Sequence, residues 1–294
     1  MLCAERHRVQ QGDEGRGPTV QIGVELLALD PAWLTGSSPT SARLRYFNSW
    51  TKEVAATSGL TSAVDFADVH WLGTYDNPDW TIGPELASVA NIGPAIASLR
   101  RTLDTNSRQG HHVRILAGEV NSAPAAMPYS ATQSNAAYLA DTELALLAAG
   151  AREVHWFGLY SALQRGSPTA DLGLLSTGNC QETCESPVGT RLPTYYAQQL
   201  VSAVARPGGR LIGRSTTGAI ATHAVREPDG SLAILLVNRS AGPVRTRLAL
   251  RGYRARGCAA LLRTRGDGIQ HDLVRPTDAF DLPAYAVALV QLHR

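Results

Sequence analysis

The sequence lacks a long apolar run and shows no excess of charge of one sign. Its uncharged apolar runs, such as Leu144–Gly150, are far shorter than the roughly 20 residues that a membrane-spanning helix requires. With 27 basic and 25 acidic residues the formal net charge is +2, and no basic stripe with interleaved aromatic residues occurs. We therefore expect no membrane-spanning helix and no nucleic-acid partner.

The sequence also lacks an apolar stretch behind a basic start within residues 1–17, so the chain as written is expected to be cytoplasmic. Cysteine is scarce, and Cys180 and Cys184 form a CxxxC pair in a loop with Gly, Ser and Pro. Without a second Cys/His pair nearby this is a weak zinc signal. A loop-closing disulfide is the favoured interpretation, free thiols are the alternative, and a metal site fits least. A disulfide would imply export, against the N-terminal pattern.

The first two-thirds of the chain alternates short apolar runs with longer helix-like stretches. The expected strands are Val20–Leu29, Val64–Leu72, His112–Val120 and Arg152–Tyr160. The expected helices are Leu44–Ala56, Pro94–Leu103, Asn135–Ala149 and Thr194–Ala205. Strands that alternate with helices of this length are typical of βα units around a parallel sheet.

The pattern changes at Arg206-Pro207-Gly208-Gly209, after which short β-type runs are separated by turns. The expected strands are Ala219–Arg226, Ser231–Asn238, Val244–Leu250, Cys258–Arg263 and Ala284–Leu292. Glu227-Pro228-Asp229-Gly230 predicts a hairpin turn, because Pro presets one dihedral and Gly accepts positive φ. The sequence thus predicts two domains, residues 1–206 with a parallel sheet and residues 207–294 as a small antiparallel β-sandwich.

Ionisable and aromatic residues follow the apolar runs at three expected strand ends. Glu119 closes one run, His70 and Trp71 close the run before it, and Trp156 and Tyr160 close the run after it. Flat aromatic faces stack on sugar rings, and a carboxylate beside them can attack or stabilise an oxocarbenium-like centre. A lone strand-end Glu is equally compatible with a structural pair, and each Trp or His with simple packing.

The ordered stretches VDFADVHWLG, ILAGEVNS, VHWFGLYS and LPTYYAQQLV resemble the actinobacterial α-L-arabinofuranosidase-type enzymes, which are retaining glycoside hydrolases on (β/α)₈ barrels. The stretch ATHAVREPDGSLAILLVNRS resembles the β-sandwich that follows the barrel in those proteins. The resemblance implies that residues 1–206 are the C-terminal half of a (β/α)₈ barrel, with strands five to eight. It also implies a carbohydrate substrate, secretion, and no metal or organic cofactor.

The resemblance implies roles for individual residues. Glu119 matches the catalytic nucleophile on the seventh barrel strand, and Trp156 is similar to the aromatic that floors the sugar subsite. His70 and Trp71 match the end of the sixth strand, near the nucleophile. The other expected substrate-binding residues are Asn121 and Tyr160. The Cys180–Cys184 pair resembles a loop disulfide of secreted relatives.

The chain departs from that family in one respect that matters for catalysis. The family's general acid/base is a Glu, typically after an Asn, at the end of the fourth strand, but no Asn-Glu dipeptide occurs here. Glu25 in the first strand could be mistaken for this partner, yet a retaining pair needs carboxyl groups about 5–5.5 Å apart. We expect a truncated barrel that lacks the first four βα units, and that self-associates or needs a separate N-terminal half.

Three hypotheses stand at this point. The first is a retaining hydrolase for arabinofuranosides or related plant or cell-wall glycans, with a genuine nucleophile but weak activity alone. The second is a non-catalytic carbohydrate-binding protein that uses Trp71, Trp156 and the β-domain. The third is an unrelated α/β protein in which Glu119 is structural.

Overall fold

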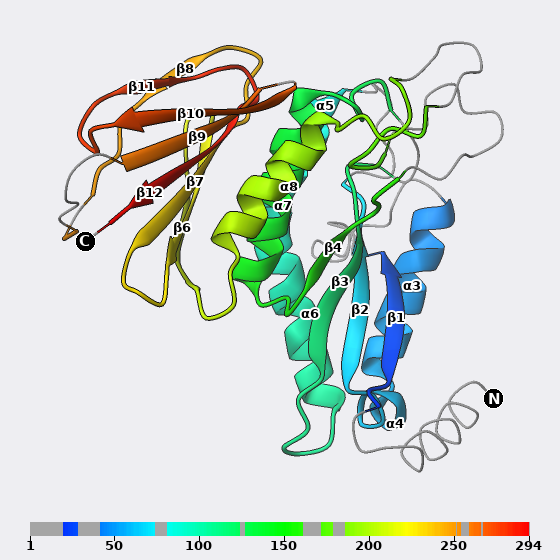
Figure 1. Ribbon diagram of the computed structural model, residues 1–294. Coiled ribbons are helices and arrows are strands. Elements are labelled where there is room, and N and C mark those ends of the chain that lie inside the picture. The colour runs from blue at the N-terminus through cyan, green and yellow to red at the C-terminus, as the bar shows by residue number, and fades with distance from the viewer. Residues whose placement is uncertain are drawn as a thin grey trace.

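The computed structural model describes most of the chain in nine stretches. These are residues 20–28, 42–73, 81–123, 127–160, 172–178, 186–250, 252–253, 259–265 and 267–293. Within them a parallel sheet, a group of helices and an antiparallel sheet follow one another across the molecule (Figure 1). The fold is therefore mixed α/β, with parallel and antiparallel strands in separate sheets.

Four parallel strands form the first sheet, in the order β1-β2-β3-β4. They are β1 (Gly23–Ala28), β2 (Phe66–Trp71), β3 (Arg114–Val120) and β4 (Val154–Trp156). All four strands expected from the apolar runs are present. The fourth is shorter than expected because residues 158–160 leave β3 and bond to Leu174 and Leu175 instead.

The helices lie between the strands in the chain and cover one face of this sheet. They are α3 (Ala42–Ala56), α4 (Ser58–Thr61), α5 (Ile82–Ser88), α6 (Ile92–Asn106), α7 (Gln133–Ala149) and α8 (Pro193–Val204), with a 3₁₀ turn at Val89–Asn91. Helix α8 begins with Pro193, which is favoured in a first turn, and α7 ends at Gly150 in the left-handed conformation. These signals set helix ends close to the expected ones.

The antiparallel sheet has six strands in the order β10-β9-β12-β7-β6-β5, and β8 and β11 form a separate two-stranded pair. The strands are β5 (Arg210–Thr217), β6 (Ile220–Arg226), β7 (Leu232–Asn238), β8 (Val244–Thr246), β9 (Ala259–Arg265), β10 (Gly268–Val274), β11 (Phe280–Leu282) and β12 (Val287–Leu292). Gly230 takes φ of 85° in the turn between β6 and β7, as expected for this hairpin.

Helices α7 and α8 lie between the two sheets, and one apolar core passes through them (Figure 1). It runs from Val69 and Leu139 through Leu200 to Leu235 and Leu289. A second apolar cluster fills the far side of the six-stranded sheet, so β7 is buried along its whole length. Residue 207 lies between α8 and β5, where the chain crosses to the antiparallel sheet.

A buried polar cluster also connects α7 to the antiparallel sheet. Asp141 of α7 and His223 of β6 are both fully buried, with Oδ1 and Nε2 2.8 Å apart. Arg214 Nη2 and Arg239 Nε lie 3.7 Å and 3.5 Å from the same carboxylate. A buried carboxylate requires such compensation, so these four side chains fix the sheet against the helix. None of the helices described here is long and apolar enough to cross a membrane.

Candidate active site

Three ionisable side chains from β1, β2 and β3 meet at the first sheet: His70 and Glu119 lie near the C-terminal ends of β2 and β3, and Glu25 lies in the middle of β1. His70 Nε2 lies 3.6 Å from Glu25 Oε1, and His70 Nδ1 lies 3.5 Å from Glu119 Oε2. The side chains of His70, Glu119 and Glu25 are 17%, 33% and 53% exposed, so the group is open to a solute. The structure therefore brings Glu119 and His70 together as expected, and adds Glu25 on the other ring nitrogen.

The alternation of β2 determines which of its side chains reach this group. Successive side chains of a strand point to opposite faces. Ala67, Val69 and Trp71 are buried against the helices, whereas Asp68 and His70 are partly exposed. Trp71 is only 1% exposed. The expectation that Trp71 contacts a ligand is corrected, because adjacent residues such as His70 and Trp71 cannot both face the site.

Asn121 also lies inside the protein rather than on the open face. Its side chain is fully buried, and its amide nitrogen donates to the backbone oxygens of Phe157 and Leu172. Its Oδ1 accepts the backbone N–H of Ser122 at 2.7 Å. The expected substrate contact is therefore replaced by a structural one, in which Asn121 ties the end of β3 to the chain that follows β4.

Trp156, the last residue of β4, and Tyr160, which follows β4, differ in exposure. Tyr160 is 48% exposed, so one face of its ring is free to meet a ligand. Trp156 is only partly exposed, its indole donates to Leu172 O at 3.3 Å, and its ring lies 6.4 Å from that of Tyr138. Trp156 pairs in register with Val120, the residue after Glu119. Trp156 thus packs toward α7 on the helix-covered side, as Val120 does, and Tyr160 lies beyond the end of the sheet, where its partner is Leu175.

Asp68 belongs to the same face of β2 as His70, although the sequence analysis did not single it out. Its Oδ1 accepts the backbone N–H of Gly118 at 2.7 Å. Burial raises the pKa of Asp68 above its usual value, and the Gly118 hydrogen bond opposes that shift. The signal that could have found Asp68 is its position two residues before His70, which puts both on one face.

No group of three or more His, Cys, Asp or Glu side chains within the described ranges is arranged to hold a metal ion. Cys180 and Cys184, the expected disulfide pair, lie outside the described residues.

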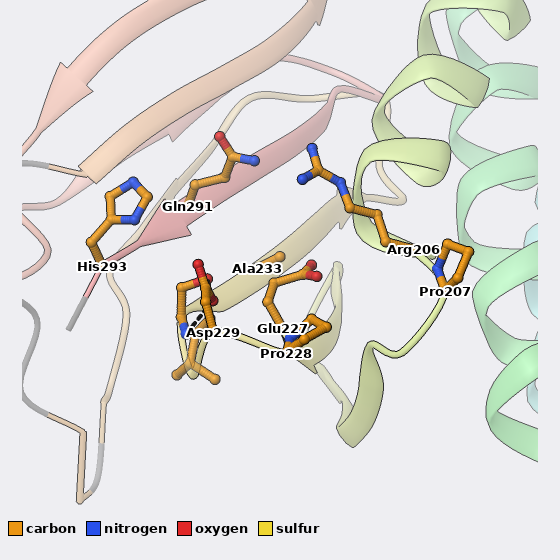
Figure 2. Close-up of a pocket in the computed structure, with 10 residues that line it drawn as sticks. Arg206, Pro207, Glu227, Pro228, Asp229, Ala233, Gln291 and His293 are labelled. Atoms are coloured by element: carbon orange, nitrogen blue, oxygen red, sulfur yellow. Dashed lines mark hydrogen bonds between the residues drawn. The ribbon is translucent and has the colours of Figure 1, made fainter.

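A hollow of about 340 Å³ lies elsewhere, between the end of α8, the β6–β7 turn and the end of β12 (Figure 2). Arg206, Glu227, Gln291 and His293 border it, and its described lining residues include no Trp, Tyr or Phe. The Asp229 carboxylate accepts the backbone N–H and hydroxyl of Ser231, which hold the pKa of Asp229 below its usual value. Asp229 is thus a turn residue, and the described part of this hollow offers no aromatic ring on which a sugar could stack.

No family model matches the sequence, and no curated protein matches it. Solved structures do resemble it. A family 51 α-L-arabinofuranosidase from Bifidobacterium longum is 16% identical with a TM-score of 0.65, over 99% of this chain and 62% of that protein. A GH51 α-L-arabinofuranosidase from Thermotoga petrophila is 11% identical with a TM-score of 0.65, again over 99% and 62%. The chain spans about 62% of the length of these two proteins.

A GH30 endoxylanase from Clostridium papyrosolvens is also similar, with 12% identity and a TM-score of 0.56 over the whole of this chain and 70% of the enzyme. At such identities the likeness shows the fold. The chain therefore shares its mixed α/β architecture, a parallel sheet followed by an antiparallel sheet, with glycoside hydrolases of the arabinofuranosidase and xylanase type.

Proposed function

We propose that this chain is the nucleophile-bearing part of a retaining glycoside hydrolase that acts on α-L-arabinofuranosides or related plant or cell-wall glycans. One observation carries the proposal: Glu119 stands partly exposed near the end of a parallel strand, beside His70, in a fold shared with α-L-arabinofuranosidases. In α/β barrels the chemistry lies at the C-terminal ends of the strands. This placement supports a role for Glu119 in glycosidic bond cleavage.

In the proposed reaction a Glu119 oxygen attacks the anomeric carbon as the bond from that carbon to the leaving oxygen breaks. The leaving oxygen takes a proton from a general acid, and water then hydrolyses the glycosyl ester. His70, in contact with Glu119 Oε2, would hold the carboxylate in its attacking orientation. Tyr160 offers an exposed ring on which a sugar face could stack.

Glu25 is not the general acid in this proposal. Glu25 and Glu119 contact different nitrogens of the His70 ring, so an imidazole separates the two carboxylates. A retaining pair requires carboxyl groups about 5–5.5 Å apart with nothing but substrate between them. Glu25 is therefore assigned to the support of His70, and the acid/base carboxylate to residues beyond this group.

We assign β1–β4 to barrel strands five to eight, and β5–β12 to the β-sandwich that follows the barrel in the family. Both β1 and β4 are edge strands of their sheet, and barrel closure pairs such edges with further strands. We assign the general acid to those further strands. Without that acid, turnover is expected to fall by about 10²–10⁴-fold for substrates with poor leaving groups.

Hydrolysis of aryl α-L-arabinofuranosides tests this assignment. A nitrophenolate leaving group needs little protonation, so the purified chain should release it measurably, whereas an alkyl arabinofuranoside should react far more slowly. Glu119→Ala should abolish release, and added azide should restore it by taking the place of the carboxylate. Glu227→Gln, on the antiparallel sheet side, is the matched control and should behave as wild type. Unchanged release by Glu119→Ala would contradict the proposal.

A further inference from the structure

Strand β3 contains one residue more than its partner β2 at the level of the site. Val69 pairs with Ala117 and His70 pairs with Glu119, so Gly118 has no partner residue on β2. This is a β-bulge, in which the extra residue is left unpaired and the strand alternation shifts by one. The bulge lies directly before Glu119.

The shift decides which face of the sheet receives Glu119. Ile115 and Ala117 are buried on the helix-covered face, and strict alternation would send Glu119 to that face as well. Instead Glu119 is 33% exposed and Val120 is fully buried. A single unpaired residue therefore moves Glu119 to the open face that carries His70, and moves Val120 into the core.

Asp68 takes the hydrogen bond that the bulge leaves unmade. The backbone N–H of Gly118 donates to Asp68 Oδ1 at 2.7 Å, in place of a backbone oxygen of the neighbouring strand. A Cβ at position 118 would overlap both carboxylate oxygens of Asp68, so the carboxylate would have to move to admit any other side chain. Glycine at this position therefore lets Asp68 approach the backbone N–H that it accepts.

We propose that Asp68 is a positioning residue for Glu119: by accepting the Gly118 N–H it holds the bulge that turns the Glu119 side chain toward His70. The effect on reactivity rests on the proposed role of Glu119 as nucleophile, whereas the effect on the bulge does not. An uncharged acceptor serves equally, because the carbonyl oxygen of an amide can accept the same N–H.

Two measurements on the full chain separate these effects. The first is the exchange rate of the Gly118 amide hydrogen by NMR, which reports the hydrogen bond without any activity. The second is the rate of covalent labelling by a 2-fluoro-arabinofuranosyl reagent with an activated leaving group, resolved into a maximal rate and a half-saturating concentration. The variants are Asp68→Ala, Asp68→Asn and Gly118→Ala.

Asp68→Ala is expected to speed Gly118 exchange about fivefold or more, since one lost hydrogen bond is worth roughly 1 kcal/mol. It should lower the maximal labelling rate by about 10–100-fold, because a misplacement near 1 Å has effects of that size. The half-saturating concentration should stay nearly unchanged. Asp68→Asn should restore both readouts, and Gly118→Ala should slow labelling as Asp68→Ala does.

Asp65→Ala is the matched control, because the Asp65 carboxylate accepts the backbone N–H of Ile22 at 2.8 Å, just before β2 and away from Glu119. It should leave labelling unchanged. The inference is overturned if Gly118 exchange in Asp68→Ala equals that of wild type, or if Asp68→Asn is as impaired as Asp68→Ala. Should Asp68→Ala fail to fold, labelling of Gly118→Ala at the wild-type rate would overturn it. If Gly118 of the wild-type chain exchanges slowly but the chain takes no label, the proposed function is refuted, whereas the role of Asp68 in holding the bulge is not.

Discussion

The Glu119 carboxylate lies 3.5 Å from His70 Nδ1, on residues that pair directly across β2 and β3. The other nitrogen of the same ring lies 3.6 Å from Glu25. The imidazole is thus held between carboxylates of the two strands that flank β2. This arrangement assigns Glu119 the reacting position, His70 the contact that orients it, and Glu25 the contact that orients His70.

Removal of His70 and removal of Glu25 should therefore have unequal effects. His70→Ala removes the contact to Glu119. If that contact stabilises the transition state by as much as one hydrogen bond, about 1.4 kcal/mol, its loss slows release of nitrophenolate about tenfold. Glu25→Gln removes an exposed charge whose pairing is worth about 0.2–1 kcal/mol, so the rate should fall no more than about fivefold. Steady-state rates of the two variants decide this. A larger loss of rate in Glu25→Gln than in His70→Ala would contradict the assignment of His70 as the residue that orients Glu119.

Trp71 and Tyr160 should respond to truncation in opposite ways. Trp71 is buried in the core, so Trp71→Ala should lower the free energy of unfolding by about 3–5 kcal/mol. Tyr160 is 48% exposed, so Tyr160→Ala should change the free energy of unfolding by about 0.5 kcal/mol or less. The same substitution should raise the KM for an arabinofuranoside. Urea unfolding and steady-state kinetics measure the two quantities. A stable Trp71→Ala chain with a raised KM would restore Trp71 to the site.

The contact between Asp141 and His223 should carry much of the attachment of the antiparallel sheet. Both side chains are fully buried, and Asp141 also lies near Arg214 and Arg239. Asp141→Ala leaves the buried His223 and the partly exposed Arg214 and Arg239 without this partner, so unfolding should become easier by about 3–5 kcal/mol.

The exposed pair of Asp281 and Arg245 is the matched control for Asp141. Their side chains are 62% and 70% exposed, with Asp281 Oδ1 3.6 Å from Arg245 Nη1. Asp281→Ala should lower the free energy of unfolding by about 1 kcal/mol or less. Urea titrations of both variants test the difference, and similar losses would show that the buried cluster is not the stronger attachment.

Glu143 should make the stability of the chain fall as the pH rises. Burial raises its pKa from 4.5 to about 8, and Gln198 donates to its Oε2 at 2.9 Å. Between these pH values the folded chain keeps a proton that the unfolded chain releases. The free energy of unfolding should fall by at most about 1.4 kcal/mol per pH unit from this group. Glu143→Gln should remove this contribution to the pH dependence of the free energy of unfolding, and should be more stable than wild type at pH 8. The same pH dependence in both chains would refute the assignment.

Much of the fold could be predicted from the sequence because buried strands and helices leave apolar runs. The four parallel strands and helices α3, α6, α7 and α8 follow this rule, whereas the short helices α4 and α5 were not expected. Strands β5, β10 and β11 were missed. Edge strand β5 is exposed at nearly every position, and edge strand β10 has few buried residues, so neither carries an apolar run or clear alternation. Such strands form because a neighbouring strand offers its hydrogen bonds, and that neighbour is distant in sequence.

The candidate site could be predicted only in part. Glu119 follows an apolar run, which marks a strand end, but its face depends on a bulge at Gly118 that no local pattern reveals. Trp71 could have been excluded by alternation once His70 was placed on the open face. The role of Asn121 could not, because its partners Phe157 and Leu172 lie 36 and 51 residues away along the chain.

Intact-mass spectrometry after incubation with an activated 2-fluoro-arabinofuranosyl reagent tests the central claim most directly. The fluorine slows hydrolysis of the glycosyl ester, and the activated leaving group needs no general acid, so the nucleophile is tested alone. The account predicts a mass increase of one glycosyl unit, located on Glu119 by peptide mapping and absent in Glu119→Gln. A folded chain that gains no mass, or that carries the label on another residue, would contradict it.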